Sequence, residues 1–559
     1  MSITNQQGIH NLICSGASFA NLTLGNRASV DCEFTLDSDI VATTLQVSGL
    51  SAAARQLVRS DTLGTARKIK NTTLSAMSYV DFQDIDASLN ASGVARGSAW
   101  SGTSIGNCLG NTNITFTSTV FRYAVATGNW SDITCWSATN GGASGASSPL
   151  PQDTAVFSAS SGANTITANQ PRLCSFLDMT SAYGNGVSTA TLYLNGNTVY
   201  YDKFYIFGPC YLYPDTTTSL NCLGLYLRSR TGLPSLRFSG SASVFINFPL
   251  IIDGGGTYSL TNRTHLSTST LTLSKGTLTH GVSNSLQVTL SALILTGTDT
   301  RTIDFDLNNN GVNWNLTGTG TVLDITNGTN LTLNSGLSVL NITDASSTTK
   351  TLYCGAKTFY QILLSGSGTG MYYFIGGFYC TEFKSTKTNA YTIQFQHGYT
   401  LPWYYFRRFT VRGSSGNIVT IQSDAGGYHF QCVFKLLTGT GYRGYAESDY
   451  LKLIDTAGLG PSDQTSEYWY AGANSIDDTS TGGTNSYWMW TDWQLSTKFD
   501  SVRARDDTSP FNKRTLSTVI RTKFDSVRAR DDTSPFNKRT ISPVIRTKFH
   551  GITTRDDTS

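Results

Sequence analysis

The spacing of apolar residues between residues 251 and 364 is the feature that most limits how this chain can fold. Short segments at 271–273, 286–290 and 303–307 place an apolar residue at every second position, which sends these side chains to one face of a strand. Gly, Asn, Ser and Thr separate the segments too often for a helix of ordinary length. The pattern therefore predicts a long series of strands of about three to five residues.

Strands this short do not pair stably as isolated hairpins, and the Asn-Gly and Asp-Gly pairs that close tight hairpins are scarce. A coil that stacks on itself suits them better, because each rung covers the apolar side chains of the rung before it. The many Thr residues fit a half-exposed pleated surface. We predict an all-β chain that is mostly a right-handed parallel β-helix (a β-solenoid), with an antiparallel β-sandwich as the alternative.

Changes in alternation and composition divide the chain into six regions. They are a small N-terminal β region (1–62), a first solenoid segment (63–122), a cap or insert with Trp130 and Trp136 (123–160), the main solenoid (161–435), a C-terminal cap region (436–496) and a repetitive tail (497–559). Residues 51–70 turn basic and lose the alternation, which indicates a loop or a linker. The two Trp residues and the aromatic residues at 487–493 are expected to cap the solenoid ends, with sugar stacking by the Trp pair as the alternative.

The composition argues against an enzyme. Glu occurs only four times in 559 residues, whereas glycan cleavage on a β-helix needs paired carboxylates. Asp304, Asp306 and Asp324 lie within expected strands, where a solvated outer face explains them more simply than catalysis. The histidines are scattered and show no metal-ligand spacing. We expect no catalytic residue, no metal and no cofactor.

Ten cysteines are scattered singly without a C-x-x-C pair, so we expect them to be mostly small buried hydrophobes. The first residues do not resemble a signal peptide, and no apolar run approaches the roughly 18 residues of a membrane span. These features predict a chain made in the cytoplasm without membrane insertion.

Several motifs resemble those of phage and prophage proteins. They are SGTSIGNCLGN at 101–111, GNWS at 128–131 with PQDTAVF at 151–157, GNIVTIQSD at 416–424 and WYAGANS at 469–475. Their order is similar to that in Thr/Gly-rich, β-helix-like proteins of tailed phages and prophages, which are tail-fibre-like and mostly uncharacterised. The resemblance covers about residues 56–490 and rests on scaffold motifs without attached chemistry. It implies a virion protein made in the host cytoplasm, and by analogy with phage fibres a homotrimer.

An aromatic stretch near residue 405 is the predicted receptor-binding patch. Exposed aromatic and Arg side chains favour contact with carbohydrate or protein. Part of the stretch breaks the strand alternation, which indicates side chains that do not serve the core. The patch, expected to bind a host surface glycan or protein, comprises Trp403, Tyr404, Tyr405, Arg407 and Arg408.

The tail contains a 25-residue repeat that begins at Thr497, recurs from Thr522 and starts again at Thr547. Each full copy carries six Lys or Arg against three Asp, so the tail is basic although the chain has a net charge of only +3. We predict that each copy is a linear docking peptide for an acidic groove on another virion protein, with a solvated disordered tail as the alternative. The predicted docking residues are Phe499, Arg503, Arg505, Asp506, Asp507, Phe511, Arg514, Phe524, Arg528, Arg530, Asp531, Asp532, Phe536 and Arg539.

Together these features predict a non-enzymatic structural protein of a bacteriophage virion that takes part in host attachment, with no nucleic-acid partner. Its place would be a tail fibre, a baseplate or a capsid-attached fibre. A polysaccharide-depolymerising tailspike and a bacterial surface adhesin are the alternatives.

Overall fold

The structure is a computed structural model that describes most of residues 2–489 and three short segments of the tail. The described tail segments are 502–504, 527–531 and 552–556. The gaps before residue 490 are 6–7, 14–15, 27–31, 180–189, 196–202, 213–216, 221, 231–234, 239–243, 247, 262–265, 281–286, 308, 310, 344, 399–402, 435–444, 447, 460–468, 482–484 and 486–487.

The chain is nearly all β: 52 % is strand, and stacked parallel coils form a β-solenoid of about 15 turns. The described residues contain no α-helix, only the 3₁₀ turns η1 (Ile133–Cys135) and η2 (Ala159–Ser161). Every pairing between described strands is parallel except that of β11 (Phe121–Ala124) with β13 (Trp136–Ser137). The prediction of a parallel solenoid is therefore confirmed, and the antiparallel sandwich is excluded; right-handedness stays a prediction.

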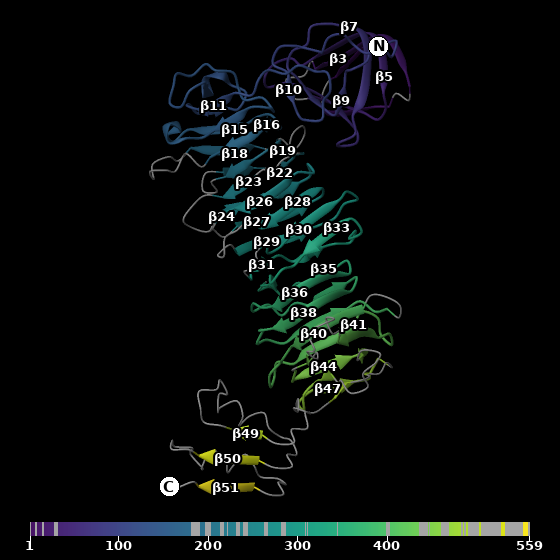
Figure 1. The fold of residues 1–559 in the computed structure, drawn as a ribbon, viewed down its shortest axis with the longest axis vertical. Helices are drawn as coiled ribbons and strands as arrows, with labels where there is room; N and C mark the ends of the chain where they lie inside the picture. The colour runs from purple at the N-terminus through teal and green to yellow at the C-terminus, as the bar shows by residue number, and fades with distance from the viewer. Residues whose placement is uncertain are drawn as a thin grey trace.

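The first part of the chain forms a solenoid of its own with two parallel sheets (Figure 1). One sheet holds β1 (Ser2–Asn5), β3 (Ser18–Asn26), β5 (Ile40–Ser48), β7 (Arg67–Leu74) and β9 (Ile85–Asp86). The other holds β2 (Gly8–Leu12), β4 (Cys32–Leu36), β6 (Gln56–Ser60), β8 (Val80–Gln83) and β10 (Gly106–Asn107). Their inward side chains share one core, from Leu12 to Ile105. We call this part the N-terminal solenoid.

Strands β6 and β7 correct the expected linker at 51–70. Each is paired on both sides within its sheet, so the predicted boundary at residue 62 falls inside one continuous body. The alternation failed as a signal because buried polar side chains occur on both sides of the chain here. Arg55 and Gln56 are almost fully buried, and Asp81 is the acceptor for Arg55.

The remaining strands form the main solenoid, whose rungs have three faces and share one core from Ala124 to Trp488. Face 1 holds β16 (Arg172–Cys174), β19 (Lys203–Ile206), β22 (Gly224–Leu227), β25 (Leu250–Ile252), the second halves of β27 (Leu266–Leu273) and β29 (Gln287–Ile294), β32 (Gly320–Asp324), β35 (Lys350–Tyr353), β37 (Tyr372–Ile375), β39 (Tyr391–Phe395), β41 (Val419–Ser423), β44 (Leu451–Ile454) and β47 (Ile476–Asp478).

Face 2 holds β11, β14 (Thr154–Val156), β17 (Phe176–Asp178), β20 (Cys210–Leu212), β23 (Ser235–Phe238), β26 (Thr257–Thr261), β28 (Gly276–His280), β30 (Arg301–Asp304), β33 (Leu331–Asn334), the first halves of β36 (Lys357–Leu364), β38 (Phe378–Ser385) and β40 (Trp403–Thr410), β42 (Phe430–Phe434) and β45 (Thr456–Leu459). Face 3 holds β12 (Gly128–Asn129), β15 (Thr165–Ala168), β18 (Thr191–Asn195), β21 (Thr217–Leu220), β24 (Val244–Ile246), the first halves of β27 and β29, β31 (Asn313–Leu316), β34 (Val339–Ile342), the second halves of β36, β38 and β40, β43 (Tyr445–Ala446), β46 (Trp469–Tyr470) and β48 (Trp488–Met489).

Stacked aliphatic side chains hold the rungs together. Leu316 pairs with Ile342, and Ile342 pairs with Leu364, so three successive rungs place an aliphatic residue at the same inward position. All three are buried, and burial of such a side chain stabilises the fold by about 1.5–3 kcal/mol. No disulfide links the described cysteines, and all of them except Cys222 are buried, which confirms their role as small hydrophobes.

The two predicted caps lie at the ends of the main core. Trp130 and Trp136 are fully buried, with ring centroids 4.9 Å apart, and the Trp136 indole donates to the Trp130 carbonyl (2.8 Å). Because neither ring is exposed, the sugar-stacking alternative is excluded. At the other end, the Trp488 ring packs 5.1 Å from that of Trp469, and the strands β43 to β48 occupy described parts of residues 445–489. Of the aromatic residues predicted to form this cap, Tyr487, Trp490 and Trp493 lie outside the described residues.

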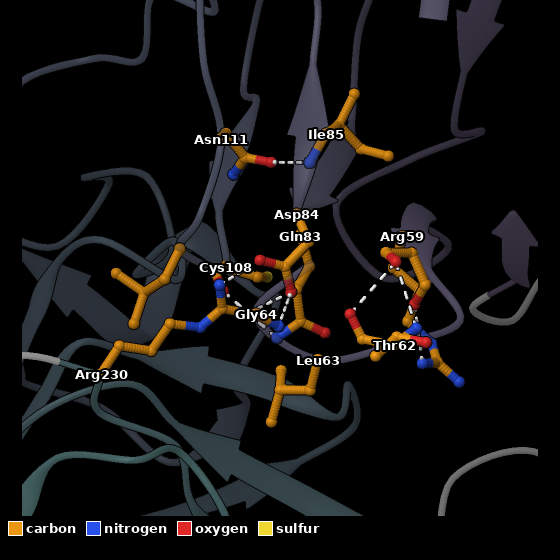
Figure 2. Close-up of polar contacts among 12 residues, drawn as sticks. Arg59, Thr62, Leu63, Gly64, Gln83, Asp84, Ile85, Cys108, Asn111 and Arg230 are labelled. Atoms are coloured by element: carbon orange, nitrogen blue, oxygen red, sulfur yellow. Dashed lines mark hydrogen bonds and ion pairs between the residues drawn. The ribbon is translucent and has the colours of Figure 1, made fainter. Parts of the chain in front are cut away.

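Buried ion pairs and a small apolar cluster join the N-terminal solenoid to face 1 of the main solenoid. Asp81 accepts hydrogen bonds from Arg55 (Nε to Oδ1, 3.0 Å) and from Arg172 (Nε to Oδ2, 2.6 Å). Figure 2 shows the neighbouring pair, in which Arg230 reaches Asp84 from the main solenoid. We call these contacts the joint.

The charge at the joint is stabilised by partners from both solenoids. Burial alone would raise the pKa of Asp81, but the Arg55 and Arg172 guanidiniums outweigh it and lower the pKa below its ordinary value. The joint also contains an apolar cluster, in which Leu57 and Cys108 of the N-terminal solenoid pack against Phe207 of the main solenoid. The joint therefore buries an ionised carboxylate that belongs to one solenoid and is paired by the other.

Candidate functional site

The predicted receptor-binding patch lies on β40, where the strand bends from face 2 to face 3. Phe406 and Phe409 both point into the core although they are three residues apart, so the side-chain alternation changes phase at Arg407 and Arg408. The two arginines occupy the outer corner of the rod. The break in alternation that suggested a patch is therefore a bend of the strand.

Tyr404 does not belong to this surface. Its side chain is fully buried, and its hydroxyl donates to the Phe374 carbonyl (3.1 Å) and accepts from the Gln396 backbone N–H (3.0 Å). Tyr404 precedes the bend and follows the inward parity of Phe406, so its prediction as a receptor contact is wrong. Trp403 lies on β40, and its side chain is outside the described residues.

Tyr405 points outward, and its ring lies tilted against that of Tyr379 in the preceding rung. The two residues are register partners on β38 and β40, and their ring centroids lie 6.3 Å apart at an interplanar angle of 30°. Partial burial raises the pKa of both phenols, so both stay neutral near neutral pH. Sequence reasoning left Tyr379 out of the patch, although a spacing of one rung connects it to Tyr405.

A short polar ladder continues from this tyrosine pair around the corner. Arg408 lies 3.3 Å from Glu382 (Nη1 to Oε1), and the Gln361 amide donates to the other carboxylate oxygen (2.7 Å). Arg408 is exposed and Glu382 is partly exposed, so this pair contributes little to folding. We define the corner patch as Tyr379, Glu382, Tyr405, Arg407 and Arg408.

The corner patch has the chemistry of a binding surface. The Tyr405 phenol and two guanidiniums can stack on aromatic or sugar rings and donate hydrogen bonds, whereas the Tyr379 hydroxyl is buried. Its single carboxylate has no second carboxylate within the patch, whereas hydrolysis of a glycosidic bond uses two. The side chains of the patch therefore fit a recognition surface.

The three aspartates weighed for catalysis have turn roles. Asp306 is buried, and its carboxylate accepts from the backbone N–H groups of Gly311 (2.8 Å) and Leu337 (3.3 Å). Asp304 accepts from the Asp306 N–H and Asp324 from the Thr326 N–H, two residues further along in each case. The expectation of a solvated outer face is wrong for Asp306, because its carboxylate closes a turn between rungs.

The tail repeats stack as parallel strands in the described segments. In β49 (Val502–Ala504) Val502 pairs with Val527 of β50 (Val527–Asp531), and Val527 pairs with Ile552 of β51 (Ile552–Asp556). Each pairing spans 25 residues, the same separation as between Leu225 and Leu250 in the main solenoid. The repeat period is thus the length of a solenoid rung.

Four of the predicted docking residues lie on these strands, and the rest lie outside the described residues. Those on strands are Arg503, Arg528, Arg530 and Asp531. Those outside are Phe499, Arg505, Asp506, Asp507, Phe511, Arg514, Phe524, Asp532, Phe536 and Arg539. Docking through a linear peptide stays a prediction. Arg503, Arg528, Arg530 and Asp531 lie in paired strands, so any docking by these four residues would use strands of a sheet.

Comparisons with protein-family models, curated proteins and solved structures give no match for this chain. Within the described part of the chain, no three His, Cys, Asp or Glu residues are grouped so as to share a metal ion. In the same residues no helix is long and apolar enough to cross a membrane.

Proposed function

We propose that this chain is a non-enzymatic structural protein of a bacteriophage particle that acts in host attachment, as part of a tail fibre, a baseplate or a capsid-attached fibre. The observation that carries the proposal is the solenoid of about 15 parallel turns with a continuous core. A stack of this kind makes a stiff rod, which suits a protein that holds a binding surface away from its base. The resemblance of the scaffold motifs to phage proteins supports the same assignment.

The corner patch is the proposed contact with the host surface, a glycan or a protein. Aromatic and Arg side chains dominate the energy of many recognition surfaces, and the patch presents both on a rigid bend. The basic tail is the proposed contact with other virion proteins. Homotrimerisation is proposed by analogy with phage fibres, in which parallel chains share one axis.

The experiment is an inventory of the proteins in purified phage particles, combined with gold-labelled antibodies against this chain in electron micrographs. We expect the chain to be present and the label to lie on a fibre or baseplate. Absence from particles that carry its gene would contradict the proposal. Particles with Tyr405→Ala and Arg407→Ala should adsorb to host cells more slowly, whereas Tyr211→Ala, an outward Tyr on face 2, should leave adsorption unchanged.

The second candidate is a polysaccharide-depolymerising tailspike, because a β-solenoid also fits that class of enzyme. Incubation of the purified protein with capsular polysaccharide or lipopolysaccharide distinguishes the two. We expect no release of reducing ends. Release that an Asp→Asn change abolishes would assign the protein to the tailspikes.

A further inference from the structure

A second cluster of polar and aromatic side chains lies at the end of face 1, apart from the corner patch. Asp424, just after β41, receives three hydrogen bonds from the two preceding rungs. The backbone N–H of His397 and its Nδ1 both lie 2.7 Å from Oδ1, and the Tyr373 hydroxyl donates to Oδ2 (2.6 Å). These donors outweigh the effect of burial and lower the pKa of Asp424, so the carboxylate is ionised near neutral pH.

This arrangement fixes the tautomer of His397. An ionised carboxylate only accepts hydrogen bonds, so Nδ1 must carry the proton, and in the neutral ring Nε2 is then an acceptor. The His397 side chain is 42 % exposed, so a solute can reach the ring. Asp424 thus holds an imidazole in one orientation at the surface of the rod.

Tyr428 places an aromatic ring beside this imidazole. The ring centroids lie 5.5 Å apart, and Tyr428 is 50 % exposed. The turn that carries it is fixed from the next rung, because the Gly427 N–H and the Thr481 hydroxyl both donate to Asp455 Oδ2 (3.0 and 2.7 Å). If the cluster served only to hold neighbouring rungs together, it would need the Asp424 carboxylate and the His397 backbone N–H. It would not need two exposed rings side by side.

We propose that the cluster of Tyr373, His397, Asp424 and Tyr428 is a saccharide-binding subsite for a neutral pyranose. The Tyr428 ring covers the apolar C–H face of the sugar, and His397 Nε2 accepts a hydrogen bond from a sugar hydroxyl. This inference deepens the proposed function and rests on it, because it names the ligand class that an attachment protein would bind.

The neighbouring side chains favour a neutral sugar over a charged ligand. Gln394 and Gln422, on the same two rungs, form an amide pair (3.0 Å) that offers neutral donors and acceptors. The cluster itself contains no Lys or Arg, and its one carboxylate already has three donors. An anionic ligand would find no counter-charge within the cluster, and a cationic one would compete with His397 and Tyr373 for Asp424.

The test is saturation-transfer NMR on the full chain with a panel of methyl pyranosides (glucoside, galactoside, mannoside and the N-acetylglucosaminide), each at about 10 mM, which detects a Kd on the order of 1 mM. We expect at least one to bind. Tyr428→Ala and His397→Ala should weaken binding about tenfold or more, whereas Tyr428→Phe should retain it because the ring remains. Tyr211→Ala, an outward Tyr on face 2 that belongs to neither cluster, should have no effect, and circular dichroism checks the fold of each variant.

The inference is overturned if no pyranoside of the panel binds, or if folded Tyr428→Ala and His397→Ala bind as the unchanged protein does. Either result leaves presence in the particle unaffected, because the particle inventory does not depend on sugar binding. Conversely, a chain that is absent from particles but binds a pyranoside would contradict the proposed function alone.

Discussion

Two pairs of outward-facing tyrosines on the main solenoid have different surroundings. Tyr205 and Tyr226 lie on face 1 with ring centroids 5.0 Å apart, and the Arg228 guanidinium lies over Tyr205 at 4.4 Å. Tyr205 also packs against the apolar cluster of the joint. The Tyr379–Tyr405 pair has the same register relation, but Figure 1 shows β38 and β40 far from the N-terminal solenoid.

At the joint, an outward tyrosine pair of the main solenoid forms part of a contact surface, and we propose a contact role for the corner patch as well. At the joint, the partner of that surface is the N-terminal solenoid of the same chain. At the corner patch, the same arrangement lies next to exposed charge and is available to another molecule. We expect substitutions at the joint to affect folding more than substitutions at the corner patch.

Loss of the buried carboxylate should have the largest effect. Asp81→Asn leaves Arg55 and Arg172 buried opposite a neutral amide, so we expect the free energy of unfolding to fall by about 3–5 kcal/mol. Glu382→Gln at the corner patch is the matched control and should change it by less than about 1 kcal/mol. Chemical denaturation measures both. Equal effects would remove the distinction between joint and patch.

The same ion pairs predict a response to acid. The pKa of Asp81 is lowered in the folded chain, so its contribution to stability is full above the pKa of the unfolded chain, about 4, and is lost as the pH falls below it. The stability difference between the unchanged protein and Asp81→Asn should therefore shrink below about pH 4. A difference that stays constant down to about pH 2 would contradict the assigned ion pairs.

The paired tyrosines allow a direct comparison of the two surfaces. Tyr205→Ala removes a ring from the joint together with its contact to Arg228, so we expect a loss of about 2 kcal/mol. Tyr405→Ala removes an outward ring from the corner patch and should cost about 0.5–1 kcal/mol. Thermal unfolding of both variants tests this. A larger loss for Tyr405→Ala would mean that the corner patch is part of the scaffold.

The sequence was sufficient to predict the solenoid because its core follows a local rule: apolar residues alternate with polar ones within each short strand. Leu316, Ile342 and Leu364 each lie in a short alternating segment, and stacking follows from many such segments. The rule failed at Gln56, a polar residue at an inward position, and at Arg55, which is buried at the joint and not in the core. It also failed at Tyr404. Alternation shows whether a side chain points into the core or outward only when the position of the bend in the strand is known.

Contacts between distant residues could not be read from local patterns. Arg172 reaches Asp81 across 91 residues, and neither residue has a sequence context that identifies the other. His397 and Asp424 are 27 residues apart, about one rung, and only the register of β39 with β41 brings them together. Scattered histidines therefore gave no signal of a cluster before the rungs were aligned.

The smallest effect on folding is expected at Arg408. Its contact with Glu382 is 3.3 Å long, and Arg408 is exposed, so solvent and side-chain entropy offset most of the attraction. Arg408→Ala should change the free energy of unfolding by no more than about 0.5 kcal/mol while it weakens attachment to host cells. Arg122→Ala, on face 2 near the start of the main solenoid, is the control for adsorption: it removes a charge that is hydrogen-bonded to Ser147, away from the corner patch, and should leave adsorption unchanged. If Arg408→Ala destabilises the chain by more than about 2 kcal/mol, the polar ladder at the bend serves the fold. If it leaves both folding and adsorption unchanged, the corner patch is not the receptor contact, and the exposed rings of His397 and Tyr428 become the stronger candidate.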